Sequence, residues 1–436
     1  MQRMPGDDTI VVVGGGLCGL TAAAFLARSG CAVTVLERSS TPGGRAVTRR
    51  SGGFAINLGP HALYRGGHAV RVLDELGVAH PGGTPGASGA CAFDRGAVHA
   101  LPGGFVSLLT TGLFGLSAKL ETGRVLGGLA RTDAESLDRT SVRDWVDARV
   151  RHPDVRRLVH ALLRLATYAD APDTMSAGLA VRQLQAALAS NVSYLDGGWQ
   201  TLVDGVRTRA EEAGAHVRTA AAVTAVERGA DRSLTGVRLR DGELVGARAV
   251  VLALDAAAAA EVLPDGPARR HAAAAVPVLA GCLDVALSRL PRPQATFALG
   301  IDRPLYFSVH SAVARLAPEG GALIHVAQYL GDGAQEPRTV ERELEDALDR
   351  MQPGWRMHVV ERRFLPRMVA ASALATAAQG GLAGRPGTEV PEVPGLYLAG
   401  DWVGPDGWLV DASLASGRHA AQLAARRVGR RAAAAA

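Results

Sequence analysis

The chain has 436 residues, of which 47% are hydrophobic and 20% are charged. This length exceeds that of one ordinary domain and predicts two, with the composition of a soluble globular protein. The formal net charge is +5, but the arginines are scattered and aromatic residues make up only 4% of the chain. We therefore expect no basic surface with stacking aromatic rings, and no nucleic-acid binding.

The spacing of the cysteines and the length of the apolar segments indicate the cellular compartment in which the protein is expected. Cys18, Cys31, Cys91 and Cys282 have no CxxC or other metal-ligand spacing, so we predict no metal site and a reducing environment. The residues before Thr9 lack the apolar region of a signal peptide, and no apolar run reaches the roughly 18 residues that cross a bilayer. We expect a cytoplasmic protein.

The first 36 residues predict the opening unit of a parallel sheet. Residues 9–13 are a β-branched strand, residues 17–28 an alanine-rich buried helix and residues 32–36 a second strand. A glycine turn joins the first strand to the helix. This β-turn-α-β order indicates an α/β fold with a doubly wound, Rossmann-type domain.

Two later stretches are predicted to return to that domain, which is therefore discontinuous. Strands are expected at 214–217, 222–227, 235–240, 249–254 and 396–399, and a helix at 412–427. We assign residues 1–75, 196–270 and 385–436 to the first domain.

The remaining ranges, 76–195 and 271–384, predict a second, mixed α+β domain that binds substrate. Residues 101–195 have a helical pattern, and strands are expected at 282–287, 306–310, 322–329 and 357–364.

The glycine turn has the GxGxxG spacing of a dinucleotide site. Gly14 permits the tight turn, Gly16 lets a pyrophosphate approach the helix N-terminus, and Gly19 lets the helix pack closely on the strand. Glu37 ends the second strand, where a carboxylate accepts hydrogen bonds from an adenosine ribose. Because a glycine turn alone also occurs in unrelated α/β proteins, the prediction depends on the strand, helix and acid together.

Several further segments identify a family. Residues 43–45 read Gly-Gly-Arg, 59–64 Gly-Pro-His-Ala-Leu-Tyr and 196–202 Asp-Gly-Gly-Trp-Gln-Thr-Leu. Near the end, 395–402 read Gly-Leu-Tyr-Leu-Ala-Gly-Asp-Trp and 411–417 read Asp-Ala-Ser-Leu-Ala-Ser-Gly. In these segments the chain resembles the flavin amine oxidase superfamily, which includes monoamine and polyamine oxidases, protoporphyrinogen oxidase and the phytoene desaturases. The 59–64 segment looks most like the branch related to phytoene dehydrogenase.

The resemblance implies FAD as cofactor. Arg45 supplies positive charge near phosphate or flavin, Asp401 accepts from ribityl hydroxyls, and the helix near residue 412 directs its positive end toward the flavin. Each feature also has a structural alternative, namely a surface turn for Arg45 and a packing helix at the C-terminus. The predicted cofactor-binding residues are Gly14, Gly15, Gly16, Leu17, Cys18, Gly19, Glu37, Arg38, Gly44, Arg45, Gly59, Pro60, His61, Val223, Gly400, Asp401, Leu409 and Val410.

The chain also departs from the amine oxidases. Leu409, beside Trp408, stands where that branch often places a tyrosine of an aromatic cage, and residues 281–288 lack the lysine that many members use. No cysteine occurs between residues 364 and 400, so we expect FAD to be bound non-covalently. The candidate catalytic residues are His61, Tyr64 and Trp408; a structural histidine bonded to backbone explains His61 equally well.

These features predict an FAD-dependent oxidoreductase that accepts a hydride at flavin N5 from a small, rather apolar substrate, as desaturases and dehydrogenases of secondary metabolism do. The alternatives are an amine or amino-acid oxidase and a redox-neutral mutase or isomerase. A small molecule is the expected partner, and the oligomeric state is left open. The apolar segment 101–129 predicts either membrane contact or, as we favour, the core of the substrate domain.

Overall fold

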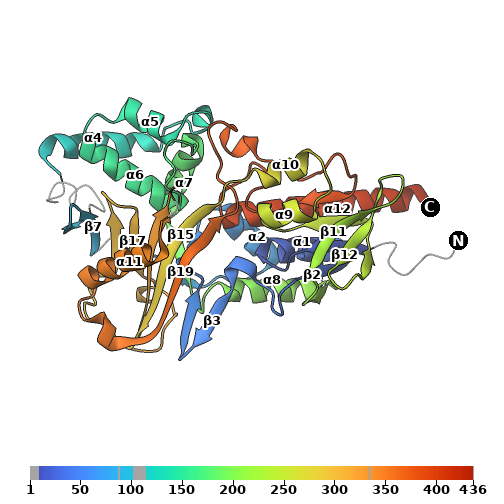
Figure 1. Ribbon diagram of the computed structural model, residues 1–436, viewed down its shortest axis with the longest axis horizontal. Helices are drawn as coiled ribbons and strands as arrows, with labels where there is room; N and C mark the ends of the chain where they lie inside the picture. The colour runs from blue at the N-terminus through green and yellow to red at the C-terminus, as the bar shows by residue number, and fades with distance from the viewer. Residues whose placement is uncertain (1–8, 87–88, 102–113, 332, 334, 436) are drawn as a thin grey trace.

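The computed structural model describes residues 9–86, 89–101, 114–331, 333 and 335–435. Two large β-sheets organise these residues, one parallel and one mostly antiparallel. The parallel sheet lies at the end of the molecule that carries both termini, and the second sheet lies at the opposite end beneath a group of helices (Figure 1). This arrangement confirms the predicted α/β class with a second mixed unit; the residue ranges assigned to the two domains stay a prediction.

The parallel sheet has five strands contributed by three distant stretches of the chain. Its order is β10 (His216–Arg218), β2 (Ala32–Leu36), β1 (Thr9–Val13), β14 (Ala249–Leu252) and β20 (Leu396–Leu398). All neighbouring pairs are parallel. The carboxyl ends of the strands therefore meet at one edge, where open α/β sheets bind their ligands.

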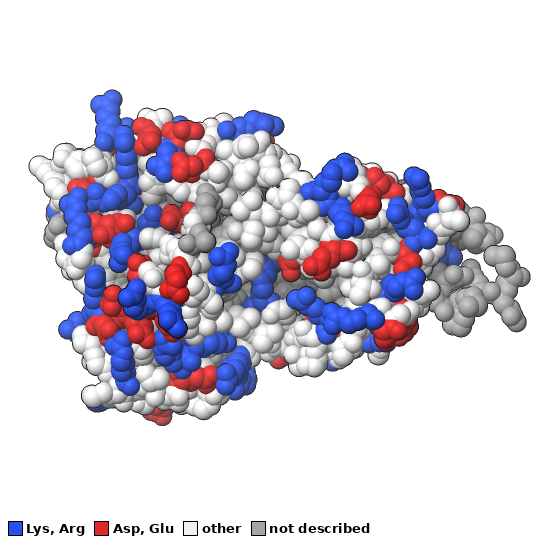
Figure 2. All heavy atoms as spheres, viewed as in Figure 1, with Lys and Arg blue, Asp and Glu red and all other residues white. Residues whose placement is uncertain are grey.

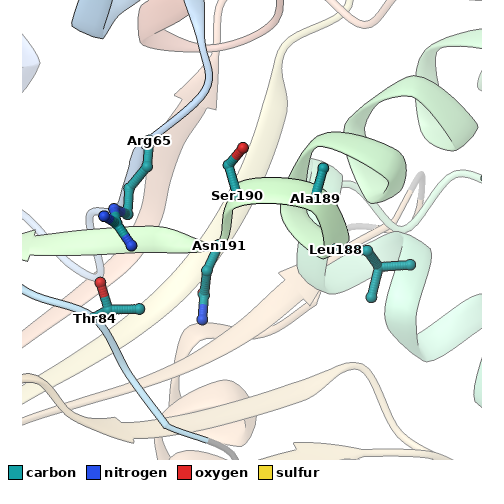
Figure 3. Close-up of a pocket in the computed structure, with 6 residues that line it drawn as sticks. All are labelled: Arg65, Thr84, Leu188, Ala189, Ser190 and Asn191. Atoms are coloured by element: carbon teal, nitrogen blue, oxygen red, sulfur yellow. The ribbon is translucent and has the colours of Figure 1, made fainter.

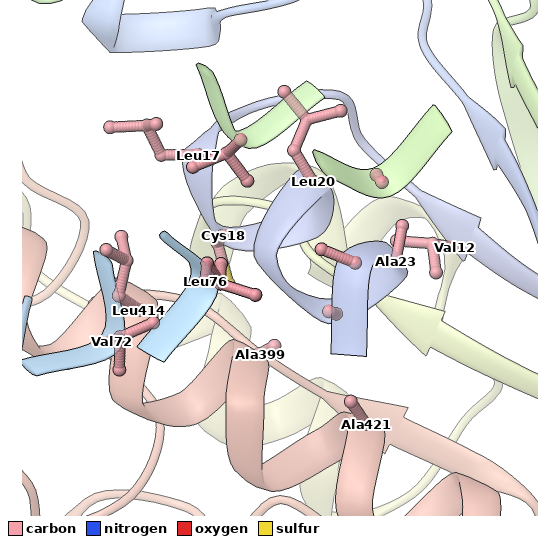
Figure 4. Packing of buried hydrophobic residues seen from close by; sticks show 14 of the residues in the cluster. Val12, Leu17, Cys18, Leu20, Ala23, Val72, Leu76, Ala399, Leu414 and Ala421 are labelled. Carbon is pink, nitrogen blue, oxygen red and sulfur yellow. The ribbon is translucent and has the colours of Figure 1, made fainter. Parts of the chain in front are cut away.

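Alternating side chains of the parallel sheet enter two different cores. Ile10 and Val12 pack with the helices on one face, whereas Val11 and Val13 pack on the other face with an antiparallel meander. Figure 4 shows Val12 among side chains of the helical core, including Leu20 and Leu414. The helices are α1 (Leu17–Arg28), α2 (His68–Leu76), α8 (Gln200–Glu212) and α12 (Val410–Ala435). The opposite face is covered by β11 (Val223–Arg228), β12 (Leu234–Leu239), β13 (Leu244–Gly246), α9 (Ala256–Val262) and α10 (Pro267–Ala273).

The second sheet has seven strands. Its order is β19 (Val359–Ala371), β15 (Val278–Leu287), β18 (Ala322–Leu330), β17 (Leu305–Val309), β16 (Phe297–Gly300), β7 (Ala90–Asp94) and β8 (Ala97–Ala100). Helix α11 (Pro337–Met351) packs on one face. The helices above the sheet in Figure 1 are α4 (Leu116–Leu129), α5 (Val142–Arg149), α6 (Pro153–Thr167) and α7 (Ala177–Ser190).

The remaining short strands form two small sheets of their own. A hairpin of β3 (Thr48–Ser51) and β4 (Phe54–Asn57) precedes the loop that carries residues 58–62. Strand β9 (Val192–Leu195) pairs with β5 (Leu63–Tyr64) and with β6 (Gly82–Gly83).

Several predicted boundaries need correction. The strand predicted for 249–254 ends at Leu252, because Asp255 already accepts from Ala258 N at 2.8 Å and caps α9. The C-terminal helix begins at Val410 instead of residue 412, since Ser413 N donates to Leu409 O. Strand β19 continues to Ala371 because it pairs along the whole of β15.

The apolar segment predicted to touch a membrane or fill a core lies partly outside the described residues, which omit 102–113. Its described remainder includes α4, where Leu116 and Leu120 are exposed. Within the residues that the structure describes, no helix is long and apolar enough to cross a membrane.

Candidate functional site

A cavity of about 930 Å³ opens at the carboxyl edge of the parallel sheet. The residues that follow four of its strands line the cavity, namely Gly14 after β1, Glu37 after β2, Ala253 after β14 and Gly400 after β20. Strand β19 of the second sheet supplies part of the opposite wall through residues 365–370. In Figure 2, basic side chains lie on both sides of the narrowing between the two lobes of the molecule.

Most of the predicted cofactor residues meet in this one cavity. Those that line it are Gly14, Gly16, Leu17, Cys18, Glu37, Arg38, Gly44, Arg45, Pro60, His61, Val223, Gly400, Asp401, Leu409 and Val410. Gly15, Gly19 and Gly59 do not line it themselves, although the residues on either side of Gly15 and Gly59, and Cys18 before Gly19, do. The N-terminal fingerprint and the C-terminal segment also touch directly, because Cys18 Sγ lies 4.0 Å from Ser416 Oγ, 398 residues further along the chain. The fold thus brings the N-terminal and the C-terminal segments of the predicted FAD-binding motifs to the same cavity.

The three fingerprint glycines have different surroundings. Gly14 has φ +104°, and a Cβ atom there would lie 2.5 Å from Ala253 O. A Cβ at Gly19 would lie 1.9 Å from Gly14 O, so only glycine allows α1 to pack this closely on the turn. Gly16 is the N-cap of α1, and the nearest atom to its Cβ position is 4.0 Å away. Gly16, Leu17 and Cys18 line the cavity, so the first turn of α1 borders it, as an anion site at a helix N-terminus requires.

Glu37 links the second strand to this turn. Its carboxylate accepts hydrogen bonds from Gly15 N at 2.7 Å and from Ser39 N at 2.8 Å, and the side chain is buried. A carboxylate has about four acceptor positions. Glu37 therefore keeps acceptor capacity on the cavity side, where a ribose hydroxyl would donate.

Arg45 and Asp401 form an ion pair across the cavity wall, with 2.7 Å between Arg45 Nη1 and Asp401 Oδ2. Ser372 N donates to the same oxygen at 3.0 Å. Burial raises the pKa of Asp401, but the charge and hydrogen bond of Arg45 outweigh burial and hold the pKa below its ordinary value. The buried atom Asp401 Oδ1 has no hydrogen-bond partner among the described residues. It is an acceptor available to a ligand hydroxyl.

His61 lies on the wall beside Trp199, with 4.9 Å between the ring centroids. Its Nδ1 is 3.1 Å from Gly59 O, and its Nε2 is 3.2 Å from Arg45 O. Burial lowers the pKa of His61 to about 4, so the ring is neutral at pH 7. A neutral imidazole donates from one nitrogen only, which means that one of these two contacts is a hydrogen bond at a time.

Tyr64 and Trp408, predicted as catalytic, do not line the cavity. Tyr64 Oη donates to Ala166 O at 2.8 Å, and Trp408 Nε1 donates to Thr167 O at 2.9 Å. Both side chains are buried and secure the last turn of α6. This position gives them a packing role and provides no support for direct contact with substrate.

The helix end that they secure presents a residue that the sequence analysis missed. Tyr168 caps α6 with φ +61° and lines the cavity. Leu365 and Met368 of β19 and Trp199 before α8 line it as well. A tyrosine that follows a helix carries no motif, and the left-handed backbone of Tyr168 depends on tertiary contacts, so no sequence signal identifies it.

A second pocket, of about 540 Å³, is formed by other parts of the chain (Figure 3). Its lining residues are Arg65, Thr84, Leu188, Ala189, Ser190 and Asn191. None of the predicted cofactor or catalytic residues belongs to it. Of these two pockets, only the larger is therefore associated with the chemistry predicted from the sequence.

The larger cavity fits FAD by several independent criteria. Its volume lies within the roughly 300–1,000 Å³ of known ligand sites. The N-terminus of α1 suits a pyrophosphate, Glu37 suits a ribose, and Asp401 Oδ1 suits a ribityl hydroxyl. A parallel sheet whose glycine turn and strand-end carboxylate open on such a cavity defines a dinucleotide-binding protein.

A comparison with known protein families identifies the family to which this dinucleotide-binding protein belongs. The family model for flavin containing amine oxidoreductases matches residues 17–425. The chain therefore belongs to this family of FAD-dependent oxidoreductases, and the predicted resemblance is confirmed.

Both desaturases and amine-type oxidases occur among its relatives. Hydroxyneurosporene desaturase of Cereibacter sphaeroides is 30% identical over 292 residues, which is 59% of this chain and 58% of that protein. Phytoene dehydrogenase of Streptomyces griseus is 55% identical over 56 residues, 13% of this chain and 11% of that protein. L-amino-acid oxidase of Pseudechis australis is 46% identical over 65 residues, 14% of this chain and 12% of that protein. In each case the aligned segment spans less than two thirds of the relative.

Solved structures share the whole fold. Cyclohexylamine oxidase from Brevibacterium oxydans IH-35A has a TM-score of 0.71 at 17% identity and covers 97% of this chain and 100% of that chain. A variant of putrescine oxidase has a TM-score of 0.76 at 16% identity, covering 97% and 99%. At these identities the likeness concerns the fold alone.

Proposed function

We propose that the protein binds FAD non-covalently in the larger cavity and oxidises a small, largely apolar organic substrate of the desaturase or dehydrogenase type. The observation that carries this proposal is the convergence of the glycine turn, Glu37 and Asp401 on one cavity whose remaining wall is mostly apolar. When bound, FAD supplies the hydride acceptor. The chain itself supplies binding, orientation and exclusion of water.

The character of the wall supports an apolar substrate. Tyr168, Leu365, Met368 and Leu409 contribute aromatic and aliphatic surface. His61 is neutral at pH 7 because burial lowers its pKa to about 4, so it adds no charge there. Because both of its ring nitrogens already lie beside backbone carbonyl oxygens, this neutral side chain does not attract an ionic substrate.

The same wall argues against a simple amine oxidase. Trp408 is held away from the cavity by Thr167 O, so Leu409 has no aromatic partner from that position. Oxidation of an amine or amino acid is therefore the second candidate, and redox-neutral isomerisation the third.

Non-covalent binding is supported by the state of Cys18, the cysteine that lines the cavity in the described part of the chain. Burial raises the pKa of Cys18 to about 12, so the side chain stays a thiol at neutral pH. A thiol is a much weaker nucleophile than a thiolate. We expect denaturation to release FAD into the supernatant.

Anaerobic spectroscopy tests the proposed function. Protein reconstituted with FAD is mixed without oxygen, in separate samples, with an isoprenoid polyene, an alkyl amine and an L-amino acid. We expect bleaching of the flavin band by the polyene and none by the amine or amino acid. Bleaching by the amine alone would favour the second candidate. Conversion of substrate without bleaching would favour an isomerase, and absence of FAD uptake would end the proposal.

A further inference from the structure

Arg385 has an unusual environment behind the C-terminal part of the cavity wall. It follows the 3-10 turn Gly381–Gly384, and its Nη1 donates to Gly407 O at 3.1 Å. Its guanidinium lies over the ring of Trp408, 5.1 Å from the ring centroid. The atoms Nε and Nη2 are inaccessible to solvent and have no hydrogen-bond partner among the described residues.

Such an arrangement is costly for a cation. Guanidinium groups that are largely removed from solvent are normally paired with a carboxylate, as Arg363, whose side chain is 18% exposed, is with Asp284 at 2.6 Å. In the described part of the chain, Arg385 has no such ion pair. Burial lowers its pKa to about 10, although the charge of Asp401 opposes this shift. Arg385 is nevertheless a cation at pH 7. A largely buried charge without a carboxylate partner is a candidate for a functional role.

The position of Arg385 indicates what that role is. Gly407 and Trp408, which it contacts, directly precede Leu409 and Val410 in the cavity wall. Helix α12 begins at Val410, and the N-terminus of a helix carries partial positive charge. Two sources of positive potential therefore lie behind the same part of the wall, and the Asp411 carboxylate in the first turn of α12, which accepts from Ala69 N at 2.7 Å, offsets part of the contribution of the helix. The low local dielectric strengthens the effect of both.

We propose that Arg385 supplies charge to the cofactor site: together with the N-terminus of α12, it stabilises the negative charge that a flavin gains there on reduction. The inference rests on the proposed binding of FAD in this cavity. Arg385 does not line the cavity, so it acts by its electric field through the segment that carries Leu409. Its effect is an increased affinity of the bound flavin for electrons.

The test is a redox equilibrium measured on the FAD-loaded protein at pH 7. The flavin is reduced slowly in the presence of a reference dye, and the equilibrium constant for electron transfer from reduced dye to flavin is read from the spectra. For Arg385→Met we expect this constant to fall about tenfold or more, because a cation in a low-dielectric site is lost. Arg385→Lys keeps the charge and stays within about threefold of wild type.

Arg139→Met is the matched control, because Arg139 is exposed and lies beside Gly380, shortly before Arg385 in the chain. It should leave the constant unchanged. An unchanged constant in FAD-loaded Arg385→Met, or an equal fall in the control, overturns the inference. If Arg385→Met does not fold, Arg385→Gln, which keeps a donor for Gly407 O, is measured instead. The inference is also overturned if the neutral variants fold but bind no FAD, because Arg385 would then be needed for FAD binding and not for stabilising the reduced flavin.

The two proposals fail in different ways. If wild-type protein takes up no FAD, the proposed function itself is wrong and the inference falls with it. If wild-type protein takes up FAD and the neutral variants keep the wild-type equilibrium constant, the proposed function stands and only the role of Arg385 is rejected.

Discussion

The guanidinium of Arg45 lies 2.7 Å from the carboxylate of Asp401, although 356 residues separate them in the chain. The pair joins the 3-10 turn Gly44–Ala46 after β2 to the loop after β20, and both residues line the cavity. Asp401 is oriented by Arg45 and Ser372 N through Oδ2, which leaves Oδ1 available to accept from a ligand.

Asp401→Asn should weaken FAD binding about tenfold or more. The substitution removes a buried charged acceptor and leaves Arg45 without its ion pair. Titration of the FAD-free protein with FAD, followed by flavin fluorescence, measures the Kd. Asp265→Asn is the control, because the Asp265 side chain is 98% exposed. Equal affinities of Asp401→Asn and wild type would contradict the assigned role.

Substitutions at two glycines of the fingerprint should distinguish an effect on the stability of the fold from an effect on FAD binding. Gly19→Ala places a Cβ atom 1.9 Å from Gly14 O and should lower the free energy of unfolding by about 2 kcal/mol or more. Gly16→Ala has open space and should cost at most about 1 kcal/mol, yet weaken FAD binding because its methyl group enters the cavity. Urea unfolding and FAD titration measure the two effects. A Gly16→Ala protein with wild-type Kd would show that no cofactor approaches this turn.

His61 should make stability depend on pH. Burial lowers its pKa in the folded protein to about 4, whereas the unfolded chain takes up the proton near the ordinary value of 6.5. The folded state is therefore favoured above pH 6.5 and loses this stability as the pH falls toward 4. The difference in free energy of unfolding between wild type and His61→Gln should shrink or reverse across this window. His419→Gln, at an exposed position, is the control; parallel curves for wild type and His61→Gln would refute the assignment.

Tyr64→Phe and Trp408→Phe should each destabilise the fold by about 1–2 kcal/mol while leaving the Kd for FAD within about twofold of wild type. Each removes the donor to a carbonyl in the last turn of α6, Ala166 O or Thr167 O. Urea unfolding and FAD titration test this. A large change in flavin reduction at unchanged stability would instead restore the catalytic role predicted from the sequence.

Local sequence was enough to predict the elements whose formation is local. The strands Thr9–Val13 and Ala32–Leu36 and the helix Leu17–Arg28 have the predicted bounds, because β-branched runs, an alanine-rich segment and glycine punctuation agree there. Strand β19 was predicted too short, because its last residues depend on pairing with β15.

The site was predictable only where it is made of motifs. The glycine turn, Glu37 and the C-terminal loop carry recognisable spacing, and the structure places them on one cavity. Tyr168 enters the wall through a left-handed helix cap, and Arg385 meets Gly407 through loop packing. Both contacts arise from tertiary structure, so they cannot be predicted from the spacing of residues along the chain.

A crystal structure of the protein with FAD tests the central claim most directly. We predict the pyrophosphate at the N-terminus of α1, the adenosine beside Glu37 and Val223, and the isoalloxazine ring beside Leu409 and Val410. FAD bound elsewhere, or a cavity that stays free of the cofactor at saturating concentration, would contradict the account.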